Sequence, residues 1–273
     1  MEFKTVAYQT NGLDVEVYDE RFAHGDPLLE GDLEFYLEYA RRYGRGGGGP
    51  VLELGCGTGR ITWELACMGC DVVGLDLSPL MISQAKDKMF SMPSAALRHI
   101  EFLEGDMTAF DLQREFPLVI VPGRTFQCLD TVEKQKDCLK MMRGHMEDGG
   151  RLILDLFDPK FEPVSEEQLE EDENNLPIVK HPKTGNLVKI DFVERVSDMF
   201  TQTFEDTYLY SEMTYTGTVL RTEEAKLKMR WSTRQEMLHL FEMCGLEVTE
   251  EYSDFYKSAP AYGKEQVWVL KKK

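Results

Sequence analysis

The middle of the chain alternates short apolar runs with segments whose apolar residues recur at helical spacing. The apolar runs occupy residues 51–54, 71–76, 100–104, 116–121 and 151–157. After the first run, Ile61, Leu65 and Met68 recur every three or four residues, which predicts a helix. Buried strands that alternate with helices predict a doubly wound, Rossmann-like α/β fold with a mainly parallel sheet.

Two further helices are expected from their starting residues. Ser78 precedes a proline, and serine as N-cap with proline at the first helical position is a typical helix start. Thr131 is expected to cap another helix, in which Cys138, Met142 and Met146 fall near one face. Both helices fit between strands of the predicted sheet.

From about residue 160 the pattern changes. Residues 165–173 are strongly acidic and predict an exposed loop. Residues 187–229 are rich in Val, Thr, Tyr and Phe with partial alternation, which predicts a three-stranded antiparallel meander. Because this insert interrupts the sheet near its carboxyl edge, where ligands bind in doubly wound folds, we expect it to act as a lid over a ligand site.

The rest of the chain completes the expected organisation. Thr233 and Glu236 have the spacing of a capping box, and residues 246–252 and 266–270 predict a closing antiparallel pair of strands. Residues 1–49 predict an N-terminal lead-in or cap with a helix over 33–43. Residues 50–158 and 230–273 then form the ligand-binding core, and residues 159–229 form the inserted β lid.

Composition and charge narrow the class of protein. A chain of 273 residues with 42% hydrophobic content can bury the core of one large domain, with or without an insertion. Its net charge of −18 would repel the phosphate backbone of nucleic acid, which disfavours DNA or RNA as a partner. No apolar run approaches the roughly 20 residues that span a bilayer. With no targeting signal at the start, we expect a cytoplasmic protein that does not enter a membrane.

Cysteine and histidine give no support for a metal site. The six cysteines are scattered, and the one C-x-x-C pair, Cys67 and Cys70, has no second pair to complete a zinc site. The five histidines show no clustered spacing. We therefore expect Cys67 and Cys70 to be buried small apolar residues, and we expect neither a disulfide framework nor a metal.

The glycines after the first apolar run mark a ligand-binding turn. Gly55, Gly57 and Gly59 alternate, which allows a tight turn and close approach of a ligand to the backbone. A dinucleotide fingerprint needs glycine where Arg60 stands, and a Walker A loop needs a Gly-Lys-Ser/Thr sequence that is absent. Asp76 ends the second apolar run, where a doubly wound fold places an acid that accepts hydrogen bonds from ribose hydroxyls.

These motifs resemble the class I S-adenosylmethionine-dependent methyltransferases. The resemblance is carried by VLELGCGTGR at 51–60, GLDLS at 74–78, EGDMTAF at 104–110 and GGRLILDLF at 149–157. GRTFQCL at 123–129 and RWSTRQEM at 230–237 are similar to a bacterial and archaeal subgroup of these enzymes. The resemblance covers the chain except roughly residues 160–229. It is specific for the cofactor and does not specify the acceptor.

The resemblance implies a set of site residues. The glycines would pass under the methionyl part of S-adenosylmethionine, Asp76 would hold the ribose, and Asp106 with Met107 would meet the adenine. The full set of candidate cofactor residues is Tyr18, Glu53, Gly55, Cys56, Gly57, Gly59, Arg60, Asp76, Leu77, Met81, Gly105, Asp106, Met107, Val121 and Phe126. The candidate acceptor-side residues are Arg124, Asp158, Tyr208 and Arg230.

The expected reaction is transfer of the sulfonium methyl group to a small-molecule acceptor, with a nitrogen or oxygen nucleophile favoured. Since the sulfonium is already an excellent leaving group, the protein mainly aligns the acceptor and excludes water, and no catalytic base is assigned. Two alternatives stay open: a protein or tRNA methyltransferase, and a protein that binds the cofactor without turnover. A homodimer also stays open.

Overall fold

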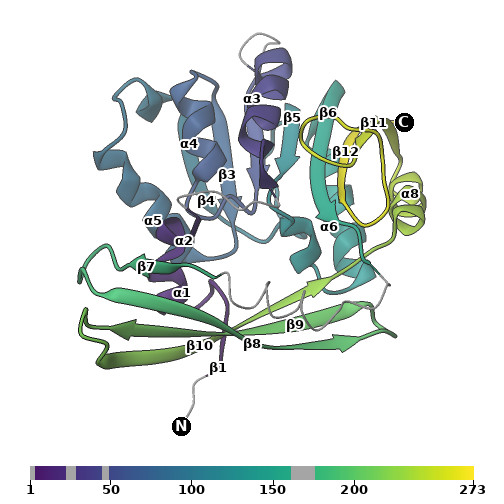
Figure 1. The fold of residues 1–273 in the computed structure, drawn as a ribbon. Helices are drawn as coiled ribbons and strands as arrows, with labels where there is room; N and C mark the ends of the chain where they lie inside the picture. The colour runs from purple at the N-terminus through teal and green to yellow at the C-terminus, as the bar shows by residue number, and fades with distance from the viewer. Residues whose placement is uncertain (1–3, 23–28, 45–48, 161–175) are drawn as a thin grey trace. The chain divides into compact units, whose positions relative to one another are not determined.

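The computed structural model describes residues 4–22, 29–44, 49–160 and 176–273 (Figure 1). The chain divides into two units. The described residues of Met1–Asp26 and Phe161–Met229 form the small unit, and those of Pro27–Lys160 and Arg230–Lys273 form the core unit. The acidic loop expected at 165–173 lies outside the described residues.

The core unit is built on a seven-stranded sheet with the strand order β11-β12-β6-β5-β2-β3-β4. The pairs β2 with β3, β2 with β5, β3 with β4 and β5 with β6 are parallel, whereas β12 is antiparallel to both β6 and β11. The predicted doubly wound, mainly parallel sheet with an antiparallel last strand is therefore confirmed. The strands are β2 (Val51–Leu54), β3 (Val72–Asp76), β4 (Ile100–Glu104), β5 (Phe116–Val121), β6 (Met146–Phe157), β11 (Leu246–Tyr252) and β12 (Glu265–Lys272).

Helices cover both faces of this sheet (Figure 1). Residues of α6 and α8 share one apolar cluster with the strands, and residues of α3 and α4 share another on the opposite face. A sheet that is covered on both faces can bury continuous apolar runs, which explains why its parallel strands do not alternate apolar with polar residues. The helices are α3 (Asp32–Tyr43), α4 (Arg60–Cys67), α5 (Pro79–Asp87), α6 (Val132–Gly144) and α8 (Arg234–Met243).

The helix starts are those expected from the sequence. The Ser78 side chain accepts a hydrogen bond from the Met81 N–H at 3.2 Å. Thr131 caps α6, and Thr233 with Glu236 forms the complete capping box of α8. Each cap satisfies backbone donors that the first helical turn leaves unpaired, so the position of each start is fixed locally.

The junction between α6 and β6 differs from the expectation. Met146 was predicted on the helix and the strand was predicted to begin at 151, but β6 already begins at Met146. Met146 is fully buried and pairs with Phe116, and the register then shifts so that Leu118 faces Arg151. Pairing with the neighbouring strand, a non-local interaction, therefore overrides the helical spacing.

The small unit contains a five-stranded sheet with the order β1-β10-β9-β8-β7. The three long strands confirm the predicted meander. A short strand lies at each edge, and the N-terminal one pairs in parallel with β10. This pairing places the first part of the expected N-terminal lead-in with the insert, whereas α3 belongs to the core unit. The elements are β1 (Lys4–Val6), α1 (Leu13–Glu16), α2 (Tyr18–Phe22), β7 (Ile178–Lys180), β8 (Leu187–Asp198), β9 (Thr203–Met213) and β10 (Val219–Arg230).

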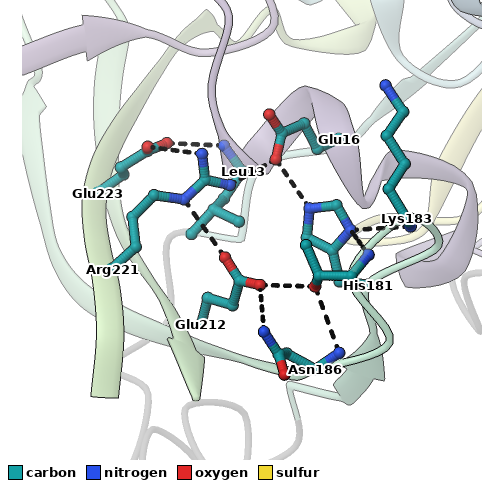
Figure 2. Close-up of polar contacts among 9 residues, drawn as sticks. Leu13, Glu16, His181, Lys183, Asn186, Glu212, Arg221 and Glu223 are labelled. Atoms are coloured by element: carbon teal, nitrogen blue, oxygen red, sulfur yellow. Dashed lines mark hydrogen bonds and ion pairs between the residues drawn. The ribbon is translucent and has the colours of Figure 1, made fainter. Parts of the chain in front are cut away.

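A cluster of hydrogen bonds and ion pairs connects α1 to this sheet (Figure 2). The Nδ1 atom of the buried His181 accepts from the Lys183 N–H at 3.1 Å, so the ring proton lies on Nε2, which donates to Glu16 at 2.8 Å. Arg221 forms ion pairs with the same Glu16 and with Glu212. The N-terminal segment is thus tied to residues more than 160 positions away in sequence.

Candidate active site

The turn after β2 has the backbone that its glycines predict. Gly55, Gly57 and Gly59 have φ angles of +66°, +55° and +80°, in the left-handed region that favours glycine. A Cβ atom on Gly55 would lie 2.1 Å from Cγ2 of Thr125, and one on Gly59 would lie 2.9 Å from Cζ of Phe102. Two of the glycines therefore allow neighbouring side chains to pack closely under the turn.

Asp76 ends β3 directly beside this turn. One carboxylate oxygen accepts from the Gly57 N–H at 2.7 Å, and the other accepts from the Ser78 N–H at 2.8 Å. Burial raises the pKa of Asp76, and the two backbone hydrogen bonds oppose that rise. Each oxygen keeps further acceptor capacity, because a carboxylate offers about four lone-pair positions. A carboxylate fixed in this way is suited to accept hydrogen bonds from a pair of ribose hydroxyls.

Two other groups complete this edge of the site. Leu77 follows the carboxylate and is 53% exposed, so an apolar surface is available next to it. Asp106 is exposed on the loop after β4, where its Oδ1 accepts from the Thr108 N–H at 2.8 Å. The Gly105 N–H donates to the Asp76 carbonyl at 2.9 Å, which holds the ends of β3 and β4 together. These acceptors and the apolar side chain fit an adenosyl group.

Glu53 and Arg60 have contacts that support the turn from within the protein. Glu53 is buried and accepts from the Thr62 hydroxyl at 2.6 Å, and burial raises its pKa to about 7. Arg60 binds the buried Asp32 through both ends of its guanidinium, with Nη1 3.0 Å from Oδ1. These contacts link α4 to the interior of β2 and to the start of α3. A role of either side chain in cofactor binding stays a prediction.

The remaining candidate cofactor residues of the core unit lie at different depths. Val121 and Phe126 are fully buried, Cys56 and Met81 are nearly so, and Met107 is partly buried against the apolar cluster of α6 and α8. Any contact of these residues with a cofactor stays a prediction.

The loop after β5 is held by a buried carboxylate. Asp155 accepts hydrogen bonds from the Gly123 N–H at 3.0 Å and from the Arg124 N–H at 2.7 Å. The Tyr36 hydroxyl of α3 donates to the same carboxylate at 2.5 Å. Burial raises the pKa of Asp155 to about 6, although these hydrogen bonds oppose the rise. Sequence reasoning did not select Asp155 or Tyr36, and the available signal was an acid within the apolar run 151–157.

The acceptor-side candidates of the core unit are engaged with other protein groups. The Arg124 guanidinium forms a half-buried ion pair with Glu265. Asp158 accepts from the Gly263 N–H at 2.8 Å and from the Gln266 side chain at 2.7 Å, which supports its role in a strand-terminating turn. Arg230 is buried and donates to Gln135 and Ser232 at 3.1 and 2.7 Å, respectively. Their roles toward an acceptor stay predictions.

The other two candidates lie in the small unit. Tyr18 of α2 packs edge-on against Tyr8, with 5.2 Å between ring centroids, and in a tilted arrangement against Phe22, with 4.9 Å between centroids. Tyr208 of β9 lies 5.8 Å from Phe192 in a T-shaped contact. Both tyrosines therefore belong to an aromatic cluster inside the small unit. Contact of either with a cofactor or acceptor stays a prediction.

Within the described ranges, no group of three His, Cys, Asp or Glu side chains is arranged to hold a metal ion. No helix in the part of the chain that the structure describes is both long and apolar enough to cross a membrane.

The chain is similar to known methyltransferases. Residues 51–150 match the family model described as a methyltransferase domain. The cypemycin N-terminal methyltransferase of a Streptomyces species is 31% identical over 112 residues, which are 41% of this chain and 43% of that protein. The chain thus matches less than half of that relative. The dTDP-3-amino-3,4,6-trideoxy-alpha-D-glucopyranose N,N-dimethyltransferase of Streptomyces venezuelae is 26% identical over 187 residues, 63% of this chain and 76% of the relative.

The fold is also found in solved structures. S-adenosylmethionine-bound CalS10, an amino pentose methyltransferase from Micromonospora echinaspora, has a TM-score of 0.68 and 19% identity, and the match covers 97% of this chain and all of that one. The core unit is a class I S-adenosylmethionine-dependent methyltransferase domain. The predicted family and S-adenosylmethionine as its cofactor are thereby confirmed.

Proposed function

We propose that the protein transfers a methyl group from S-adenosylmethionine to the amine nitrogen of a small-molecule acceptor. Two relatives support nitrogen as the acceptor atom, because their names describe methylation of a peptide N-terminus and dimethylation of an amino sugar. The net charge of −18 supports approach of a cationic or neutral molecule over that of a polyanion such as tRNA. Among the expectations from sequence, a small nitrogen nucleophile is the one that both lines of support favour.

The observation that carries the proposal is the arrangement of Asp76 at the glycine turn. Gly57 and Ser78 fix the carboxylate by backbone hydrogen bonds, so it is oriented before any ligand binds. In the proposed complex, Asp76 accepts from the ribose hydroxyls, the Leu77 side chain lies against the adenine, and Asp106 accepts from the adenine amino group. Such pre-orientation lowers the cost of ordering the site on binding.

When bound, the cofactor would supply a methyl group on a positively charged sulfur. The acceptor nitrogen would form a bond to the methyl carbon in line with the breaking C–S bond, and neutral S-adenosylhomocysteine would leave. The residues of this chain contribute position and exclusion of water, and effects of this kind can contribute about 7–11 kcal/mol. An amine that arrives in its neutral form needs no protein base, and the methylated ammonium product can release its proton to water. No residue is therefore assigned as a general base.

The test is methyl transfer from tritiated S-adenosylmethionine to three separate pools: small primary and secondary amines, peptides with free N-termini, and total tRNA. We expect label in the small amines. Main labelling of peptides would favour the activity that the cypemycin relative's name describes, and labelling of tRNA would refute the charge argument. Adenosylhomocysteine binding without label in any pool would indicate a binding protein. Asp111→Asn, which removes an exposed charge on a loop, is the control variant and should keep the activity.

A further inference from the structure

Arg21 of α2 lies among aromatic side chains of the small unit. Its Nη1 atom donates to the Tyr210 hydroxyl at 2.6 Å. The guanidinium carbon lies 4.9 Å from the centre of the Tyr208 ring and 5.2 Å from that of Phe22. These distances are within the range of cation–π contacts, so the guanidinium is held by ring faces and phenol groups.

These neighbours do not neutralise the charge of Arg21. Burial raises the pKa of Tyr210 well above its usual value, and it also raises that of Tyr208, so both phenols are uncharged at neutral pH. Arg195 in the same sheet shows the usual alternative, with Nε and Nη2 at 2.6 and 2.8 Å from the carboxylate of Asp206. Among the described residues, no carboxylate lies within ion-pair distance of Arg21.

The setting of Arg21 favours an anionic ligand. A guanidinium has five N–H donors in a planar fork that matches two oxygens of a carboxylate or phosphate. Tyr210 accepts from one donor and Tyr208 is a second hydrogen-bond partner. The residue is partly exposed, so the remaining N–H donors can face solvent. The surrounding rings lower the local dielectric, which strengthens a charge-assisted hydrogen bond and makes an unpaired charge costly.

We propose that Arg21 binds an oxyanion, the carboxylate or phosphate group of a small-molecule ligand. The residues that form this site all belong to the small unit. Arg124, a candidate acceptor-side residue from the sequence, is already paired with Glu265. A single arginine among uncharged rings offers a local site for one anion on a chain whose net charge is −18.

The test measures anion binding to the full chain by calorimetry, with inorganic phosphate and succinate as probes. Arg21→Gln should weaken binding of at least one probe by about tenfold or more, since it removes charge-assisted hydrogen bonds. Arg195→Gln removes the same charge from a carboxylate-paired arginine of the same unit and should bind like wild type within about twofold. Arg21→Lys keeps the charge without the fork and should be intermediate. The Arg21→Lys variant also tests the anion site if Arg21→Gln does not fold.

Wild-type protein that binds neither probe, or Arg21→Gln protein that binds both like wild type, would overturn the proposal. The methionyl carboxylate of the cofactor is a second source of the same chemistry. Adenosylhomocysteine carries this carboxylate and methylthioadenosine does not, so both are titrated into each variant. We expect unchanged affinity for both. Selective loss of adenosylhomocysteine binding in Arg21→Gln would assign the arginine to the cofactor and overturn the proposal of a separate anion site.

Discussion

The hydroxyl of Tyr36 donates a hydrogen bond to Oδ1 of Asp155 across 2.5 Å in the interior of the core unit. Burial raises the pKa of Tyr36 well above its usual value, so the phenol stays protonated and acts as the donor. The same carboxylate receives the N–H groups of Gly123 and Arg124. Helix α3 therefore positions the loop after β5 through one shared carboxylate.

Tyr36→Phe should destabilise the protein by about 1.5–3 kcal/mol at pH 8, because a buried carboxylate loses a donor. The folded-state pKa of Asp155, about 6, lies above the usual value of an aspartate, so its favourable contribution to stability is lost as pH rises through 6. Removing the tyrosine donor disfavours the charged form of Asp155 further. The loss of unfolding free energy caused by Tyr36→Phe should therefore be larger at pH 8 than at pH 5. Denaturant unfolding of both proteins at the two pH values measures this loss.

Tyr39→Phe is the matched control for this variant. Tyr39 lies on the same helix and bonds Glu250 at 2.7 Å, and the pKa of Glu250 is lowered, so that carboxylate is ionised at both pH values. The loss of stability caused by Tyr39→Phe should be nearly equal at pH 5 and pH 8. The same pH dependence in both variants would contradict the role given to Asp155.

Glu53→Gln should make stability less dependent on pH. Burial raises the pKa of Glu53 in the folded state to about 7, above the usual value of a glutamate, so its favourable contribution to stability, full at low pH, is lost as pH rises through 7. The stability of the variant relative to wild type should therefore rise between pH 5 and pH 8, by up to about 3 kcal/mol. A stability difference that stays constant across this range would show that Glu53 titrates normally.

Asp76→Asn should weaken adenosylhomocysteine binding at least about tenfold, because charge-assisted hydrogen bonds to the ribose are lost. An asparagine has a single acceptor oxygen, so one of the backbone N–H groups of Gly57 and Ser78 also loses its partner. Calorimetry is therefore combined with a melting curve to separate affinity from stability. Unchanged affinity in a folded variant would make this acid purely structural, and Asp111→Asn controls for the loss of charge.

Gly55→Ala should destabilise the turn and lower cofactor affinity, because the new Cβ meets Cγ2 of Thr125 at 2.1 Å and φ is +66°. Thr125→Ser removes that methyl group and keeps the hydroxyl that donates to the Pro122 carbonyl at 2.7 Å. The double variant should therefore recover part of the stability lost in Gly55→Ala, in a double-mutant cycle of melting curves. Simple additivity of the two changes would mean that backbone strain alone sets the cost.

Local patterns predicted most of the core unit. The caps at Ser78, Thr131 and Thr233 act within four residues, and the apolar runs mark strands because both faces of the sheet are covered. The start of β6 at Met146 was missed because it depends on pairing with Phe116, which lies 30 positions earlier in the sequence. The parallel pairing of β1 with β10 was missed for the same reason.

The candidate site also contains residues that local patterns predicted and residues that they missed. Glycine spacing and an acid at a strand end are local signals, and the sequence therefore selected Asp76 and the turn beside it. Asp155 and Tyr36 were missed because their contact joins α3 to β6, more than a hundred positions apart in sequence. The pairing of Arg124 with Glu265 was equally invisible, since it depends on the antiparallel neighbour β12.

The pairing of β1 with β10 also affects the order of events during synthesis. Lys4 pairs with Glu224, so the first strand of the chain has no neighbour until some 220 further residues have been made. At about 5–20 residues per second, a ribosome needs roughly 10–45 s for that stretch. Strand β1 therefore lacks its partner throughout that time, while β2 to β9 are being translated. Its pairing with β10 can form only after all strands of the parallel part of the core sheet have been synthesised.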